Sequence, residues 1–257
     1  MLPMSSASAH ELWLETESWQ SEVGEEIFFH IVNGEDFSGV NLAYFPNRVQ
    51  RFDLVEADAL RAVDSRAGDV PAATVAASDQ GLMIALYETE PSKISYKSWE
   101  KFQNFVDHKD FGADVRARHE AAGHPTEGFS ELYTRHAKAL VGIGSGEGRD
   151  KAFGLETEIV ALTNPYAADF DGQMQMRVLY QGAPRQDVQV EVFDKTPDGS
   201  VVVDRSPRTN SDGIVTVAVR AGHTYLIDAV VLRPAEAETG SAWETLWAAL
   251  TFQVPPE

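Results

Sequence analysis

The stretch that decides the fold class is QMQMRVLY, residues 173–180. Apolar or aromatic side chains occupy every second position of this run, at Met174, Met176, Val178 and Tyr180. Successive side chains of a β-strand point to opposite faces, so this alternation predicts a strand that buries one face. Gly182-Ala183-Pro184 then turns the chain, and Val188–Phe193 alternates again. The sequence here therefore predicts antiparallel β-structure.

The same pattern continues toward the C-terminus. Asp198-Gly199 and Ser211-Asp212-Gly213 are turn signals. Three further runs read as strands, at Ile214–Val219, Tyr225–Val231 and Leu246–Val254. No helix is needed in this part of the chain. Residues 164–257 are therefore predicted to form a Greek-key sandwich of about 90 residues, close to the size of an immunoglobulin domain.

Toward the N-terminus, short strands are predicted at His10–Glu17, Glu25–Asn33, Val40–Phe45, Arg51–Glu56, Ala72–Ala77, Gly81–Glu88 and Leu155–Leu162. Between Ser98 and Ala122 the apolar residues instead recur at helical spacing. We therefore expect a first β-sandwich over residues 10–163, with a helical insertion at about 97–125. Thr163-Asn164-Pro165-Tyr166 is the expected junction between the two domains.

Composition limits the classes of partner. The chain has 257 residues, with 21 basic against 40 acidic side chains and a formal charge of −19. Such a surface repels phosphate backbones, so a nucleic-acid partner is not expected. No apolar run is long enough for a transmembrane helix. Cysteine is absent, so any metal would be held by nitrogen and oxygen ligands.

The first nine residues, MLPMSSASA, end in the small residues that a signal peptidase requires. The basic and apolar regions of a signal peptide are missing. We interpret residues 1–9 as a signal-peptide remnant, with cleavage after Ala9 and export to the periplasm. The alternative is a plain polar N-terminus. Cleavage after Ala9 would leave His10 as the first residue.

His10 is the sharpest candidate for a metal ligand. A histidine at a free N-terminus offers its α-amine and Nδ1 to one ion, and both lose protons readily near neutral pH. Nitrogen ligands suit Ni²⁺, Co²⁺ and Cu²⁺ better than Ca²⁺ or Mg²⁺. Further ligands could come from His108, His119 and His124 if the helical insertion folds over the N-terminus. His30 and His223 read instead as a core and a turn histidine.

The run ELYTRHAKALV, residues 131–141, fits a helix and a strand almost equally well. We favour the strand, which places Glu131, Tyr133 and Arg135 on one face and His136 and Lys138 on the other. Tyr133, Arg135 and Lys138 form either a polar cluster that binds an anion or partner, or a structural network with nearby carboxylates. The structural alternative is preferred, because arginine pairs readily with Asp and Glu.

Several segments together resemble the bacterial periplasmic family described as a component of cobalt and nickel uptake systems. The matching pieces are Ala9-His10-Glu11-Leu12-Trp13-Leu14-Glu15, the run over residues 131–141, Leu155-Glu156 with Asn164-Pro165, Leu179-Tyr180-Gln181-Gly182-Ala183-Pro184, and Trp247-Ala248-Ala249-Leu250-Thr251-Phe252. The resemblance implies a transthyretin-like second domain, a nickel or cobalt ion, and an inner-membrane metal transporter as partner.

The expected function is therefore a non-catalytic, periplasmic metal-binding protein. One alternative is a copper monooxygenase-like enzyme, since those enzymes also begin with histidine on a β-sandwich. Another is a structural or adhesive sandwich module. The sequence has no G-x-S-x-G, Walker or H-E-x-x-H motif.

Overall fold

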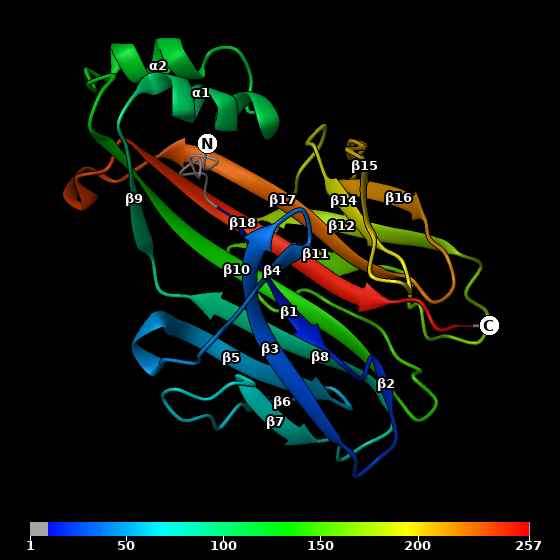
Figure 1. Cartoon of the computed structure of the whole chain (residues 1–257). Coiled ribbons are helices and arrows are strands. Elements are labelled where there is room, and N and C mark those ends of the chain that lie inside the picture. The colour runs from blue at the N-terminus through cyan, green and yellow to red at the C-terminus, as the bar shows by residue number, and fades with distance from the viewer. Residues whose placement is uncertain (1–9, 257) are drawn as a thin grey trace.

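Met174, Met176 and Val178 point into a hydrophobic core from strand β12 (Gln173–Tyr180), which begins and ends at the predicted residues. The computed structural model describes residues 10–256, so the expected signal-peptide remnant at 1–9 lies outside the described residues. The chain is mainly β, and its strands form three sheets (Figure 1). The predicted β-sandwich class is confirmed.

The largest sheet has ten strands. Its order is β15-β14-β17-β18-β10-β8-β5-β6, and β2 and β9 also pair with β10. These strands are β2 (Gln20–Ser21), β5 (Val49–Glu56), β6 (Ala59–Ala62), β8 (Gly81–Thr89), β9 (Ser92–Tyr96), β10 (Phe129–Ile143), β14 (Glu191–Lys195), β15 (Val201–Arg205), β17 (Thr224–Pro234) and β18 (Trp243–Gln253).

Two smaller sheets complete the fold. One contains β1 (Glu11–Thr16), β3 (Glu26–Glu35), β4 (Ser38–Leu42) and β7 (Ala73–Ala76). The other contains β12 with β11 (Thr157–Ala161), β13 (Ala183–Pro184) and β16 (Ile214–Ala218). Short 3₁₀ turns lie at Pro46–Arg48 and Ala237–Thr239.

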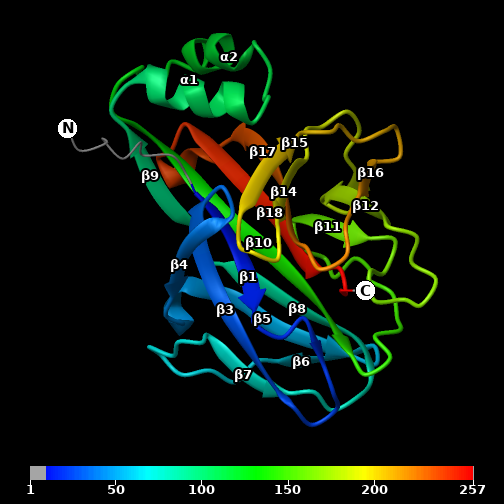
Figure 2. The ribbon, with the colours of Figure 1, turned by 45° about the vertical axis from the view of Figure 1, so that its right-hand side comes forward.

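The ten-stranded sheet is the middle of three layers. Ala137, Ala139 and Val141 of β10 pack in one core cluster with β1 and β3, whereas Leu140 packs in another with β11 and β12. Since side chains alternate along a strand, the two small sheets cover opposite faces of the large one. Figure 2 shows them on either side of β10 and β18.

The boundary expected between residues 163 and 164 is not a boundary between sheets. β10 and β18 run parallel, paired from Glu131↔Trp243 to Ala139↔Thr251, so the large sheet takes strands from both sides of residue 163. In addition, β11 lies before residue 163 in the sequence but pairs with β12, which lies after it. The physical reason is that an unpaired strand edge leaves backbone donors and acceptors unsatisfied, and joining β10 to β18 removes two such edges.

The predicted helical insertion is present between β9 and β10 as α1 (Trp99–His108) and α2 (Val115–Ala121). Phe102 and Phe105 of α1 stack on Trp243 and Trp247 of β18, with ring centroids 6.0 and 5.7 Å apart. The helices thus cover one end of the large sheet (Figure 1). Within residues 10–256 no helix has the length and apolar character needed to cross a bilayer.

Candidate functional site

The run over residues 131–141 lies within strand β10, which confirms the strand interpretation. Tyr133 and Arg135 share a face, and the Arg135 guanidinium lies 4.4 Å from the centre of the Tyr133 ring. Lys138 points to the opposite face, where it binds Asp150 and Glu158. The three residues therefore do not form one cluster, and each face of β10 has its own polar network.

Arg135 binds the N-terminal strand rather than a carboxylate. Its Nε and Nη2 both donate to the carbonyl oxygen of His10, at 3.1 and 2.6 Å. His10 immediately precedes β1 and is half-buried. Its Nδ1 is buried and has no hydrogen-bond partner among residues 10–256. The structure thus holds the backbone of His10 in place and leaves one imidazole nitrogen unpaired.

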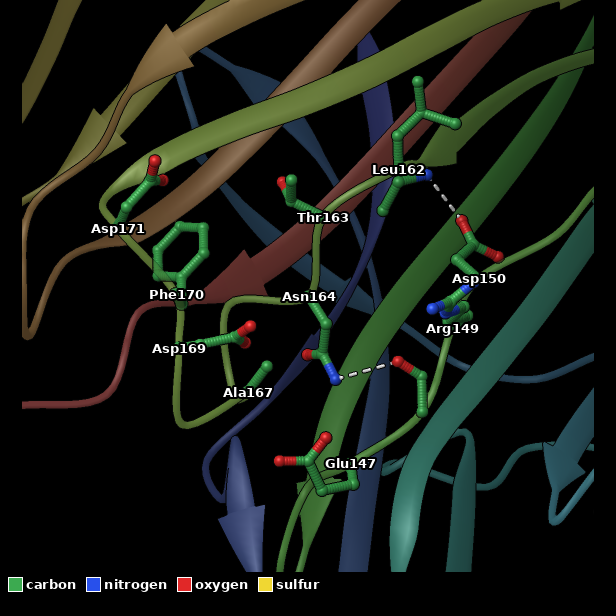
Figure 3. Close-up of a pocket in the computed structure, with 12 residues that line it drawn as sticks. Glu147, Arg149, Asp150, Leu162, Thr163, Asn164, Ala167, Asp169, Phe170 and Asp171 are labelled. Carbon is green, nitrogen blue, oxygen red and sulfur yellow. Dashed lines mark hydrogen bonds between the residues drawn. The ribbon is translucent and has the colours of Figure 1, made fainter.

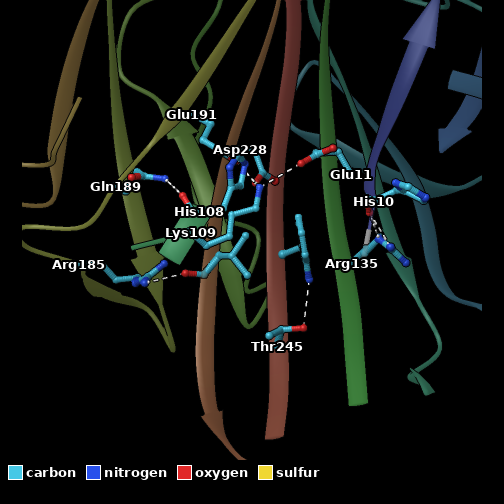
Figure 4. A network of polar contacts seen from close by, with 12 residues as sticks. His10, Glu11, His108, Lys109, Arg135, Arg185, Gln189, Glu191, Asp228 and Thr245 are labelled. Carbon is cyan, nitrogen blue, oxygen red and sulfur yellow. Dashed lines mark hydrogen bonds and ion pairs between the residues drawn. The ribbon is translucent and has the colours of Figure 1, made fainter. Parts of the chain in front are cut away.

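Next to His10, a buried lysine lies among three carboxylates (Figure 4). Lys109 follows the last residue of α1, and its Nζ lies 3.0 Å from Glu11 Oε1 and 3.1 Å from Asp228 Oδ2. Nζ also donates to Glu191 and lies 4.5 Å from the centre of the Trp247 ring. The cluster joins β1, β14, β17 and the end of α1 across one face of the large sheet.

The burial and charges of this cluster shift the pKa values of its members in different directions. Burial alone would lower the pKa of Lys109, but the charges of Asp228, Glu11 and Glu191 outweigh it and raise that pKa. Burial raises the pKa of Asp228 to about 7, although Lys109 opposes this shift. Despite its own burial, Glu191 has a lowered pKa because His108 and Lys109 bind it. The surrounding carboxylates therefore favour the protonated form of Lys109.

Glu11, Glu191 and Asp228 are also the one group of three potential metal ligands found among the described residues, with ligand atoms within 4.8 Å of one another. The Lys109 ammonium lies among these atoms and takes the place that a metal cation would need. We therefore interpret the cluster as a structural ion network.

The predicted histidine ligands do not converge on His10. His108 Nε2 lies 2.8 Å from Glu191 Oε1, and this hydrogen bond raises the pKa of His108. His119 is fully buried, and both of its nitrogens are engaged, by the Trp243 Nε1–H and the Pro125 carbonyl. The His124 ring lies 5.3 Å from the His119 ring. The helices pack on β18 and carry these two rings into an aromatic cluster.

On the other face of β10, Lys138 Nζ lies 2.7 Å from both oxygens of Asp150 and 3.1 Å from Glu158. Burial raises the pKa of Asp150, and Lys138 opposes the shift. Asp150 borders a hollow of about 410 Å³ that Arg149, Asp169 and Asp171 also line (Figure 3). Asp171 accepts a hydrogen bond from the backbone of Gln173, which is typical of an aspartate in a turn.

Sequence reasoning missed Lys109, Glu191 and Asp228. One signal was present, because Asp228 interrupts the apolar strand YLIDAVV. A carboxylate in such a run must find a partner when it is buried. No local pattern identifies that partner, since Lys109 lies 119 residues away in the sequence.

A family model described as "Domain of unknown function (DUF4198)" matches residues 7–233. The chain belongs to this family. No curated protein matches it. Among solved structures it is similar to Salmonella alpha-2-macroglobulin reacted with methylamine, at 10% identity and a TM-score of 0.23. That match covers 96% of this chain but 15% of the other.

Proposed function

We propose that this protein is an exported metal-binding protein that holds a divalent late transition metal ion through His10. The observation that carries the proposal is the buried Nδ1 of His10, which has no hydrogen-bond partner among residues 10–256. A buried ring nitrogen without a partner costs free energy unless a ligand engages it. If the chain is cleaved after Ala9, the α-amine and this nitrogen belong to the same residue and can close a chelate ring.

The proposed metal follows from the ligand chemistry. An amine and an imidazole favour nickel, cobalt or copper over magnesium or calcium. The resemblance of residues 9–15 and 131–141 to the cobalt and nickel uptake family supports nickel or cobalt. The same resemblance supports a role as an accessory that serves an inner-membrane transporter. No described group of three potential ligands includes His10, so water or the partner would complete the coordination.

The test is calorimetric titration of Ni²⁺ into three proteins. These are the 257-residue chain, residues 10–257, and residues 10–257 with His10→Ala. Every described strand and core cluster lies within residues 10–256, so removal of the first nine residues leaves these contacts intact. We expect residues 10–257 to bind at least about tenfold more tightly than either other protein, a difference of about 1.4 kcal/mol. Equal affinities for all three would contradict the proposal, because the ion would then bind at a site that does not use His10, and no binding by any of them would favour a sandwich module without metal.

A further inference from the structure

The backbone of His10 is held by a side chain rather than by a sheet. The ladder between β1 and β3 begins with Glu11, which pairs with Gly34. The carbonyl of His10 instead accepts both hydrogen bonds from the Arg135 fork, at 2.6 and 3.1 Å. Among the described hydrogen bonds, those of Arg135 connect His10 to β10.

Arg135 is itself firmly fixed. It is 7% exposed, and its guanidinium lies 4.4 Å from the centre of the Tyr133 ring and 5.8 Å from that of the Trp247 ring. The Trp247 ring is fixed in turn, because its Nε1 donates to Thr245 and its face stacks on Phe105. A guanidinium held by two rings loses little freedom when it binds, so it can hold the carbonyl in one orientation.

This contact limits where the two nitrogen donors of His10 can lie. A fixed carbonyl and a fixed Glu11 together fix the peptide plane between the two residues, and with it the Cα atom of His10. The α-nitrogen and the Cβ both extend from that Cα, so the remaining freedom is rotation about the Cα–C bond and about the side-chain bonds. The carbonyl oxygen of His10 accepts both hydrogen bonds from the guanidinium, so it is not free to act as a metal ligand. An oxygen ligand would favour harder ions.

We propose that Arg135 is a positioning residue that pre-organises His10 to chelate a metal ion through nitrogen alone. This inference rests on the proposed function of His10. Ligands held in the productive geometry before binding avoid the entropy cost of ordering them. Arg135 therefore raises metal affinity without touching the ion.

The experiment uses residues 10–257 with Cu²⁺ as the probe, because its electron paramagnetic resonance spectrum reports the donor atoms. The variants are Arg135→Gln, Arg135→Lys and His10→Ala. The matched control is Thr251→Val, which removes another side-chain bond to a β1 carbonyl, that of Thr251 Oγ1 to Leu14 at 2.6 Å. Thr251 binds the same strand at Leu14, four residues from His10. The Thr251→Val variant therefore measures how much a purely structural contact to β1 contributes to metal affinity.

We expect Arg135→Gln to weaken Cu²⁺ binding about tenfold and to give a spectrum with more than one species, because the ligands are no longer pre-organised. Arg135→Lys should recover part of the affinity, since an ammonium can make one of the two bonds. Thr251→Val should bind as the parent does. In the metal-free protein, the heteronuclear NOE of the Glu11 amide should fall in Arg135→Gln alone.

The two ways to fail are distinguishable. If His10→Ala binds Cu²⁺ like the parent, His10 is not a ligand and the proposed function fails, together with any metal-positioning role for Arg135. If His10→Ala loses binding but Arg135→Gln keeps the parent affinity and spectrum, only the role of Arg135 is overturned. The same holds if Thr251→Val weakens binding as much as Arg135→Gln, since the effect would then be general stability.

Discussion

Lys109 and Lys138 are both buried, and each is held by carboxylates close to an aromatic ring, but their carboxylates differ in what else they bind. Around Lys138, Asp150 also accepts hydrogen bonds from the backbone of Lys151 and Ala161, both at 2.8 Å. Glu158 accepts from the backbone of Phe153. These carboxylates keep donors even without the lysine.

Around Lys109 the arrangement is less redundant. Among the described contacts, Lys109 is the one hydrogen-bond donor to Glu11 and to Asp228. Glu191 has one further partner, the imidazole ring of His108. Three buried carboxylates therefore depend on the Lys109 ammonium for charge compensation, whereas two carboxylates surround Lys138. Burial and charge alone therefore do not determine how much an ion pair contributes to the free energy of unfolding. The backbone donors around the pair also matter, because they determine which groups are left unpaired when the lysine is removed.

The largest effect is expected from Lys109→Met. This change leaves three buried carboxylates near one another without their shared cation, and it should lower the free energy of unfolding by about 3–5 kcal/mol. Urea denaturation at pH 7.5 measures the loss. The control is Lys151→Met, because Lys151 pairs with Asp58 on the surface, where such a pair contributes less than about 1 kcal/mol. Similar losses in the two variants would mean that Lys109 is not the cation that holds this cluster.

A smaller loss is expected from Lys138→Met. Asp150 and Glu158 keep their backbone donors, so we expect about 2–3 kcal/mol, at the low end for a broken buried pair. The same urea experiment measures it, with Lys151→Met again as reference. A loss that exceeds that of Lys109→Met would reverse the comparison and show that backbone donors do not compensate for the missing ammonium.

The smallest effect is a change with pH in Asp228→Asn. The pKa of Asp228 is raised to about 7, so the folded protein retains a proton that the unfolded chain has lost. Stability from this group is therefore present at low pH and declines as the pH rises from about 4 to about 7. Asparagine cannot ionise, so the variant should gain about 1–2 kcal/mol relative to the parent between pH 6 and pH 8. Thermal melting at both pH values measures this, and a constant difference would show that Asp228 does not titrate in this range.

Much of the local structure could be predicted from the sequence. The alternation of residues 173–180 and the helical spacing from Trp99 to Val106 are properties of one segment, and both are confirmed. Short edge strands such as β6 were missed, because its four residues are all exposed and have no buried face to detect. The extent of each sheet was also missed, since alternation shows that a strand has two faces but not which strand lies beside it.

The candidate site was harder to predict. The alternation of side chains along a strand predicts that Arg135 and Lys138 lie on opposite faces. It does not predict that Arg135 binds the carbonyl oxygen of His10, which lies 125 residues away in the sequence. His119 was predicted as a ligand, yet the packing of the helices on Trp243 engages both of its nitrogens. Contacts of this kind depend on the tertiary arrangement, which no single segment contains.

The parallel pairing of β10 with β18 also determines when this protein can fold. β18 lies between β17 and β10, and its partner residues in β10 lie more than 100 positions earlier in the chain. A nascent chain that ends before residue 243 has both neighbouring strands but not the one that joins them. Contacts over such long separations form slowly, because the entropy of closing the loop must be overcome first. The polypeptide therefore cannot complete its ten-stranded sheet until synthesis has passed β18.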